Sequence, residues 1–460
     1  MAEPKVATPA QAPARSGGRL KAMLSGNVRQ YGMMIALLLL MLLFTFLTDG
    51  LFMQPRNITL LLVQNGYVLI LAIGMVMVII AGHIDLSVGS VCAFVGATVA
   101  LAMRDWGLPW YAAILLGIAM GILVGAWQGF WVAYVGIPAF IVTLAGMLLF
   151  RGLDLMILDA QSIPVPEEFQ AIANGYLPAV GPYTNYHNLT LLLAVLGMGV
   201  VIWMEMRRRA GLRKHNMKLP SMVASVVKIV LFSTAIIVFS LLLASYKGVP
   251  VVGLILLGLI IIYSFITQKT VFGRHIYAVG GNRNAARLTG VNTRWVDFMV
   301  MVNMAVLAGV AGMVYTAYLN AANPKDGTGF ELDAIAAVFI GGAAVTGGIG
   351  TVVGSMIGGL VMGVLNLGLA NMSVDQNLIQ VIKGLVLLAA VAFDVLSKVQ
   401  GRPSIIGMIQ RGLRRNDTNM LEDRTPVRAD SAAPTTGVSD VSASTRTDLE
   451  PDLINKPDVH

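Results

Sequence analysis

The sequence predicts an all-α polytopic membrane protein with about 10 to 12 transmembrane helices, some of them broken or re-entrant. Of its 460 residues, 56% are hydrophobic and only 12% are charged, which is too little charge to cover a soluble protein of this size. Apolar runs of roughly membrane-spanning length follow one another along the chain. The runs lie at residues 31–47, 58–81, 88–103, 111–134, 138–158, 189–206, 221–245, 249–267, 296–318, 334–345, 351–369 and 378–396.

The charges between these runs predict which loops face the cytoplasm. Residues 152–206 contain five acids but no Lys or Arg, and six basic residues then follow within residues 207–218. Under the positive-inside rule, this change marks a crossing from the outside to the inside. The basic segments 1–30, 207–218, 269–294 and 398–415 are all cytoplasmic if an even number of crossings separates each pair, and the runs satisfy this condition. Both termini are therefore predicted to be cytoplasmic.

Composition divides the chain into three parts. Residues 1–30 are basic and rich in Pro, Ala and Gly, which predicts a disordered cytoplasmic arm. Residues 31–397 form the transmembrane domain, with an extracytoplasmic loop at residues 155–188. Residues 398–460 become rich in Asp, Ser, Thr and Pro and contain few large apolar residues, so a largely disordered cytoplasmic tail is expected.

The segment 269–294, KTVFGRHIYAVGGNRNAARLTGVNTR, is a polar island inside the transmembrane domain. It carries five basic residues and no acid. Residues 284–288 are predicted to form a short helix that ends at Gly290, with Ala285 and Leu288 on a small apolar face. From the residues alone, a docking site for a soluble partner and an ordinary loop positioned by charge fit equally well.

Glycine predicts where helices pack closely and where they break. The small-residue pattern of Gly117, Gly121 and Gly125 is typical of helices whose backbones approach each other in lipid. The run GGAAVTGGIGTVVGS at residues 341–355 is too rich in glycine for a straight helix, so a break is expected near residues 347–350. No Gly-Lys pair occurs in the chain, which excludes a Walker A nucleotide loop.

Asp85 is a charge placed between two apolar runs, within GHIDLSVGS at residues 82–90. A carboxylate at the centre of a membrane helix costs about 2.5 to 3.5 kcal/mol on insertion scales. We expect a structural role, in which Asp85 or Ser87 accepts hydrogen bonds from the first free amides of the next helix in a buried break. The Val-Gly-Ser triplet around Gly89 recurs at residues 353–355, which favours this role. The alternative is a residue that lines the pathway or binds a proton.

The sequence contains no recognisable catalytic or metal-binding constellation. Its five histidines lie in different segments, and no two have the i, i+4 spacing of a helical metal site. A Gly-x-Ser-x-Gly nucleophile elbow is also absent. We therefore expect a chain that is not an enzyme and holds no metal or cofactor. The net charge of +8 is attributed to topology and to anionic lipid headgroups rather than to nucleic acid.

Three motifs in a fixed order carry a resemblance to a known family. They are GHIDLSVGS at residues 82–90, GRHIYAVGGNRNAARLTGVNT at 273–293 and AVFIGGAAVTGGIGTVVGSMIGGLVMGVLNLGL at 337–369. With them, the chain from about residue 58 to residue 396 resembles the membrane permease subunit of bacterial monosaccharide ABC importers of the ribose, xylose and galactose group. Extra sequence around residues 155–250 makes it more similar to the xylose and multiple-monosaccharide permeases than to the ribose permeases. Which monosaccharide is carried stays open.

The resemblance implies an importer in the bacterial inner membrane. An extracytoplasmic binding protein would deliver the sugar, two copies of this permease would form the pathway in the lipid, and separate ATPase subunits would bind ATP and Mg²⁺. The short helix in the basic loop would dock in a groove of the ATPase. The residues implied for this coupling are Arg283, Asn284, Ala285, Ala286, Arg287, Leu288, Thr289 and Gly290. Those implied for the family's broken-helix motifs are Asp85, Ser87, Gly89, Gly347, Gly348 and Gly350.

Uncharged polar residues within the apolar runs are candidate pathway groups, because a neutral sugar needs hydrogen-bonding partners rather than charges. Each of them could instead bridge two helices. They are Gln64, Asn65, Asn303, Asn366 and Gln380. The alternative function is an ion-coupled secondary transporter of a small polar solute, in which Asp85 would bind the coupling ion and the basic loop would have no partner.

Overall fold

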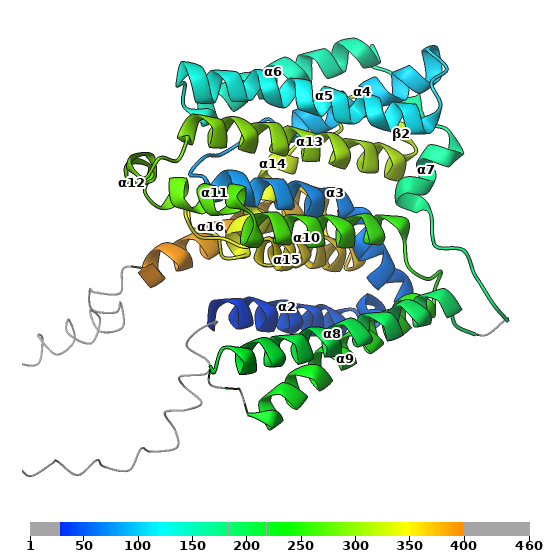
Figure 1. The fold of residues 1–460 in the computed structure, drawn as a ribbon. Helices are drawn as coiled ribbons and strands as arrows, with labels where there is room; N and C mark the ends of the chain where they lie inside the picture. Colours follow the sequence, from blue (N-terminus) through cyan, green and yellow to red (C-terminus); the bar gives the residue numbers. More distant parts are fainter. Residues whose placement is uncertain (1–27, 183–184, 218, 220, 399–460) are drawn as a thin grey trace, which may run out of the picture. The chain divides into compact units, whose positions relative to one another are not determined.

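The computed structural model describes residues 28–182, 185–217, 219 and 221–398. Nearly all of the predicted tail and of the predicted N-terminal arm lies outside the described residues. Two two-residue strands, β1 (Ile163–Pro164) and β2 (Ala321–Ala322), pair antiparallel. The α-helices are α2 (Val28–Leu47), α3 (Pro55–Ile80), α4 (Val88–Asp105), α5 (Trp110–Phe130), α6 (Ala139–Leu158), α7 (Glu167–Asn174), α8 (Asn188–Lys214), α9 (Met222–Ala244), α10 (Val251–Lys269), α11 (Val271–Gly281), α12 (Arg283–Leu288), α13 (Thr293–Leu319), α14 (Phe330–Ile340), α15 (Val352–Asn371) and α16 (Gln376–Lys398) (Figure 1).

These helices confirm the prediction of an all-α polytopic membrane protein. Among the described residues, nine helices are long and apolar enough to cross a membrane, and α2 and α16 contain shorter apolar stretches. The remaining predicted run, 334–345, corresponds to α14, which has only 11 residues. At 1.5 Å per residue it is roughly 16 Å long, about half of the hydrocarbon core of a bilayer. The expectation of short or broken segments is therefore confirmed at α14.

The α5 and α13 helices pack closely along a stripe of glycines (Figure 1). A Cβ atom at Gly121 or Gly125 would meet the backbone of α13 at Val306 or Val302, and one at Gly117 would meet the Met313 side chain. Only glycine allows such an approach, and dispersion contacts between close backbones hold helices together where lipid provides no hydrophobic drive. The predicted packing role of these glycines is confirmed. Helix α13 also packs against α3 and α4, so it lies at the centre of the helical core.

Two non-helical segments interrupt this core. Residues 81–87 separate α3 from α4, and residues 341–351 separate α14 from α15. Gly347 and Gly348 adopt φ angles of +81° and +72°, a conformation that side chains disfavour, so the break predicted near residues 347–350 is confirmed. The Gly348 N–H donates to the Ile80 carbonyl at 2.8 Å, which joins the second segment to the end of α3.

The basic segment 269–294 is more ordered than predicted. In addition to the expected short helix, α12, it contains a second helix, α11, which the sequence pattern did not predict. The Tyr277 hydroxyl on α11 donates to the Gly350 carbonyl at 2.7 Å, and the Phe272 ring lies edge-on to Trp295 at 5.4 Å. Burial raises the pKa of the Tyr277 hydroxyl above its usual value. The segment is therefore packed against the membrane domain rather than free of it.

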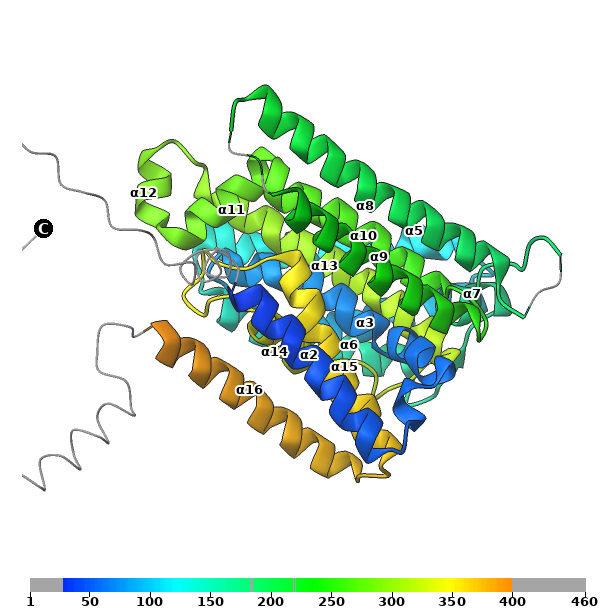
Figure 2. The ribbon, with the colours of Figure 1, turned by 90° about the horizontal axis from the view of Figure 1, so that it is seen from below.

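The α8–α9 hairpin packs largely on itself, and its two helices run beside each other (Figure 2). One charged cluster joins them toward the end of α8 and the start of α9, and it includes part of the basic segment 207–218, whose first eight residues belong to α8. Glu205 on α8 is buried and accepts hydrogen bonds from Ser225 at 3.0 Å, Lys228 at 3.1 Å and Arg208 at 3.4 Å. Removing a carboxylate from water is tolerated here because each oxygen has a partner.

Candidate functional site

A polar cavity of about 800 Å³ lies between α3, α13, α14, α15 and α16. Four of the five predicted pathway residues line it: Gln64 and Asn65 on α3, Asn366 on α15 and Gln380 on α16. The volume lies within the range of small-molecule sites, and convergent amide groups can both donate and accept hydrogen bonds. The fifth residue, Asn303, does not line the cavity. Its side chain accepts from the Tyr263 hydroxyl at 2.6 Å and lies 3.6 Å from the Met77 sulfur, so it bridges α10, α13 and α3.

Aromatic rings form one side of the polar cavity. The Tyr67 ring lies 4.2 Å from Phe330 and 4.7 Å from Tyr315, and the last two are 4.8 Å apart. Flat rings beside amide groups suit a solute with both C–H and O–H faces, such as a sugar. The sequence prediction missed Tyr67 and Tyr315 because single aromatic side chains in apolar runs are indistinguishable from packing residues, and it missed Phe330 because that residue lies between two runs.

A buried ion pair also borders the polar cavity. Lys383 on α16 contacts the Asp333 carboxylate on α14 at 2.6 Å and 2.8 Å, and the two side chains are only 17% and 11% exposed. The charges of this pair neutralise each other, and Glu331 on α14 adds a further carboxylate to the same lining. Sequence reasoning missed the pair, although a lysine inside the apolar run 378–396 was a signal for a partner of opposite charge.

The polar cavity lies toward the end of α13 that contacts the acid-rich loop 155–188. Asn174 on α7, within that loop, donates to the Tyr318 carbonyl at 3.1 Å and to Asn320 at 2.9 Å. Tyr318 also lines the cavity. The basic segment 269–294 adjoins the opposite end of α13, where α13 begins. Under the predicted topology, the polar cavity is therefore in the extracytoplasmic half of the membrane.

Asp85 is completely buried in the segment between α3 and α4. Its carboxylate accepts from the Ser87 N–H at 2.8 Å and from the Ser87 hydroxyl at 2.7 Å, and Gln128 on α5 donates to that same hydroxyl at 2.7 Å. The predicted helix cap is not formed. Ser87 occupies the N-cap position of α4 but its side chain accepts no helix amide, and Asp85 stabilises the turn one residue before the helix. Asp85 does not line the polar cavity.

The predicted short helix is present as α12. Asn282 caps its start by accepting from the Ala285 N–H at 2.9 Å, and Gly290, with φ of +88°, follows its end. Leu288 is 88% exposed, the highest value of any large apolar residue in the described parts of the chain. Ala285 is exposed beside it, whereas Ala286 is buried. The predicted apolar face thus points away from the membrane domain, where another protein can reach it.

Arg283 at the start of α12 binds an acid that the sequence prediction missed. Its guanidinium group forms an ion pair with Asp297 on α13, including a contact of 3.2 Å from Nη1 to Oδ1. His83, just before the buried turn at Asp85, donates to the same carboxylate oxygen at 2.9 Å. The carboxylate that Arg283 binds has a side chain only 1% exposed, so leaving it without this partner would be costly.

A second buried charge cluster was also missed. Asp154 on α6 is fully buried, lies 3.8 Å from the Arg151 guanidinium and has no hydrogen-bond partner among the described residues. Arg151 in turn donates to the backbone carbonyl of Asp326, in the loop that follows α13. Burial raises the pKa of the Asp326 carboxyl to about 6. These groups do not line the polar cavity.

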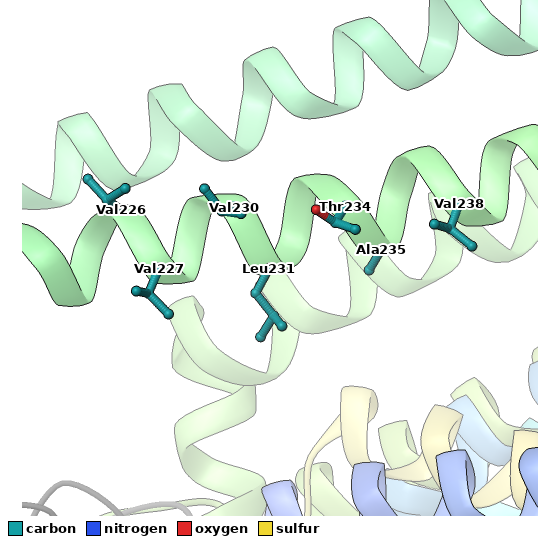
Figure 3. A pocket seen from close by; sticks show the side chains of 7 residues that line it. All are labelled: Val226, Val227, Val230, Leu231, Thr234, Ala235 and Val238. Atoms are coloured by element: carbon teal, nitrogen blue, oxygen red, sulfur yellow. The ribbon is translucent and has the colours of Figure 1, made fainter.

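An apolar hollow on α9 contrasts with the polar cavity (Figure 3). All its lining residues come from this one helix, and Thr234 supplies its single hydroxyl. Such a surface offers a sugar almost no hydrogen-bonding groups and suits lipid chains instead. The described residues contain no group of three or more His, Cys, Asp or Glu side chains placed to bind a metal ion.

Membrane-spanning helices around a polar cavity, with a separate helix that presents an apolar side chain away from the bundle, are characteristic of a transport permease. Residues 57–391 match the family model described as branched-chain amino acid transport system / permease component. The chain belongs to this family.

Several similar proteins are named as sugar permeases. The xylose transport system permease protein of Haemophilus influenzae is 38% identical over 375 residues, covering 81% of this chain and 98% of that protein. The Escherichia coli protein of the same name is 37% identical over 386 residues, covering 83% and 96%. The ribose import permease protein of Bacillus subtilis is 31% identical over 369 residues, covering 80% and 94%. No solved structure matches the chain.

Proposed function

We propose that this chain is the membrane permease of an ATP-driven importer that carries a monosaccharide across the bacterial inner membrane, and that xylose is its substrate. The polar cavity carries the proposal. It combines amide side chains with a cluster of three aromatic rings and an internally neutral ion pair, and the Glu331 carboxylate can accept hydrogen bonds from sugar hydroxyls. These groups suit a neutral polyhydroxylated ring. The names of the similar proteins support a sugar, and xylose in particular.

The importer requires partners on both sides of the membrane. A binding protein delivers the sugar at the extracytoplasmic side, where the polar cavity lies under the predicted topology. An ATPase subunit, which binds ATP and Mg²⁺, contacts α12 through Leu288 and Ala285. Two copies of the permease assemble with two ATPase subunits, and both termini are cytoplasmic. Import then follows from alternation of the polar cavity between outward and inward access.

An ion-coupled mechanism has less support. Asp85 was the candidate for the coupling-ion site, yet its carboxylate is occupied by Ser87 and lies outside the polar cavity. The exposed Leu288 on α12 also has no role in a transporter without an ATPase subunit.

Uptake into proteoliposomes tests the proposal. The permease is reconstituted with its ATPase subunit and binding protein, and radiolabelled xylose is followed with and without ATP. We expect ATP-dependent uptake, with ribose competing weakly. Gln380→Ala should reduce uptake by roughly tenfold, as expected for about 1 to 1.5 kcal/mol of lost hydrogen bonding. Thr234→Val, in the apolar hollow of α9, is the matched control and should transport normally. Uptake driven by a proton or sodium gradient without the ATPase would refute the proposal.

A further inference from the structure

We propose that Asp297 is a positioning residue that connects the ATPase-facing helix α12 to the buried segment 81–87, so that movement of α12 reaches the wall of the polar cavity. The inference rests on the proposed function of α12 as the contact with the ATPase. Movement at that contact would be transmitted by the Asp297 carboxylate and its two partners, Arg283 and His83.

The geometry brings three distant parts of the chain to one side chain. Asp297 is the fifth residue of α13 and is almost completely buried. Arg283 reaches it from α12, and His83 reaches it from the segment after α3, 214 residues earlier in the chain. Both partners bind Oδ1, at 3.2 Å and 2.9 Å, and Arg283 also binds Oδ2.

The charges around Asp297 make this link strong. A cytoplasmic-end cavity of about 530 Å³ adjoins it, and of the residues that line this cavity Asp297 is the only acid, beside His83, Arg283, Arg287 and Arg294. A buried carboxylate is costly to leave without partners. If α12 moves and draws Arg283 away, the buried carboxylate of Asp297 depends more strongly on its hydrogen bond with His83. The positions of Arg283 and His83 are therefore coupled.

The segment that His83 leads into can move without unfolding a helix. Its backbone is held by individual bonds, such as the one from the Leu86 N–H to the Thr143 hydroxyl at 3.1 Å, rather than by a helical ladder. It ends at the start of α4, where Gly89 packs so closely that an added Cβ would overlap the Gly327 carbonyl and the Glu331 carboxylate. Glu331 lines the polar cavity. A continuous series of contacts thus runs from α12 through Asp297 to the cavity.

Spatial continuity by itself does not demonstrate coupling, so the experiment measures coupling directly. The full complex of permease, ATPase and binding protein is reconstituted. Two quantities are recorded: the stimulation of ATP hydrolysis by sugar-loaded binding protein, and the rate at which a thiol reagent labels an Ile84→Cys variant with and without a non-hydrolysable ATP analogue. Ile84 is exposed within the segment, whereas the native Cys92 is buried.

Asp297→Asn should assemble normally but lose at least about fivefold in stimulation, the low end of typical coupling effects, and should lose the nucleotide dependence of Ile84→Cys labelling. Asp297→Glu should restore part of both. If Asp297→Asn does not fold, Arg283→Gln tests the same link, because Arg283 is half-exposed and its replacement disturbs the core less. The double variant should be no worse than the more impaired single variant, because both remove one connection. Arg294→Ala is the matched control, since Arg294 lines the same cavity but forms no ion pair with a described residue.

The outcomes separate this inference from the proposed function. If the wild-type complex shows sugar-stimulated hydrolysis and both Asp297→Asn and Arg283→Gln keep full stimulation and nucleotide-dependent labelling, the inference is wrong and the proposed function stands. If the wild-type complex shows no stimulation, the proposed function fails and the inference fails with it.

Discussion

At the scale of single residues, Leu288 and Ala286 show how α12 divides its apolar side chains between two surroundings. Ala286 is buried against the membrane domain, while Leu288, two residues further on, is almost fully exposed. An isolated exposed leucine needs no explanation. Here it stands on a short capped helix between basic residues, which is the arrangement expected of an anchor for a partner's groove.

Replacing Leu288 with Asp should weaken binding of the ATPase. The new charge would enter a desolvated contact without a partner, which costs about 2 to 4 kcal/mol, or roughly 30- to 1,000-fold in affinity. The permease itself should insert and fold normally, because the side chain contacts little within it. Co-purification of the ATPase and sugar-stimulated hydrolysis measure the effect. Leu288→Met is the control and should behave as wild type. Normal assembly of the Asp variant would exclude α12 as the contact.

The Asp333–Lys383 pair should contribute to stability through its burial. Lys383→Met leaves a carboxylate without its cation in a water-poor site, so we expect a loss of about 3 kcal/mol in the free energy of unfolding, seen as a lower melting temperature in detergent. The double variant Lys383→Met with Asp333→Leu removes both charges and should recover most of the loss. An unchanged melting temperature for Lys383→Met alone would show that water reaches Asp333 and screens its charge.

At the scale of elements, α11 holds the two non-helical segments together at one point. Gly280 lies so close to the end of α3 that an added Cβ would overlap the Ile80 carbonyl oxygen. The same carbonyl accepts from the Gly348 N–H, so α11, α3 and the segment 341–351 converge there. A shift of α11 would therefore displace the ends of both non-helical segments, 81–87 and 341–351.

Gly280→Ala should disturb this convergence. The methyl group cannot be accommodated against backbone atoms without a shift of α11 or α3, and overpacking of this kind costs about 1 to 3 kcal/mol. We expect reduced transport and a lower melting temperature. Gly281→Ala is a matched control on the same helix, because an added Cβ there meets nothing within 4 Å. Equal behaviour of the two variants would mean that the close approach at Gly280 has no functional weight.

The sequence predicts the elements that depend on neighbouring residues better than those that depend on contacts between residues far apart in the chain. Apolar runs, the short helix before Gly290 and the break near residues 347–350 follow from local length, capping and glycine content, and all were predicted. The α11 helix was missed because it lies in a charged, glycine-punctuated segment whose helical form depends on packing of Tyr277 and Phe272 against distant residues. Asp297 was missed for the same reason, since its partners lie elsewhere in the chain and only the fold brings them together.

At the scale of the whole molecule, the predicted topology places α7 and α12 on opposite sides of the membrane. The four amide candidates in one cavity were predictable as polar groups in apolar runs. That they converge, and that Asn303 does not, depended on helix rotation, which composition does not encode. The side of the membrane on which α7 and α12 lie is likewise predicted from loop charge.

Accessibility of introduced cysteines tests the topology. Residues 168 on α7 and 284 on α12 are both exposed, so Glu168→Cys and Asn284→Cys are suitable positions for labelling. An impermeant thiol reagent should label Glu168→Cys from the periplasm and Asn284→Cys only in inverted vesicles. Unmodified Cys92 is buried and serves as the background control. Labelling of both positions from one side would overturn the topology and the assignment of α12 to the cytoplasm.

The shortness of α14 has a consequence for how the protein is made. An 11-residue segment that carries Glu331 and Asp333 is too short and too acidic for the membrane-insertion machinery to accept as a span by itself. Its stabilising cation, Lys383, is synthesised 50 residues after Asp333. At bacterial elongation rates of about 5 to 20 residues per second, this delay is roughly 3 to 10 seconds. During that interval the nascent α14 depends on α3 and α4, which pack against it and are already synthesised, to shield its acids until α16 leaves the ribosome.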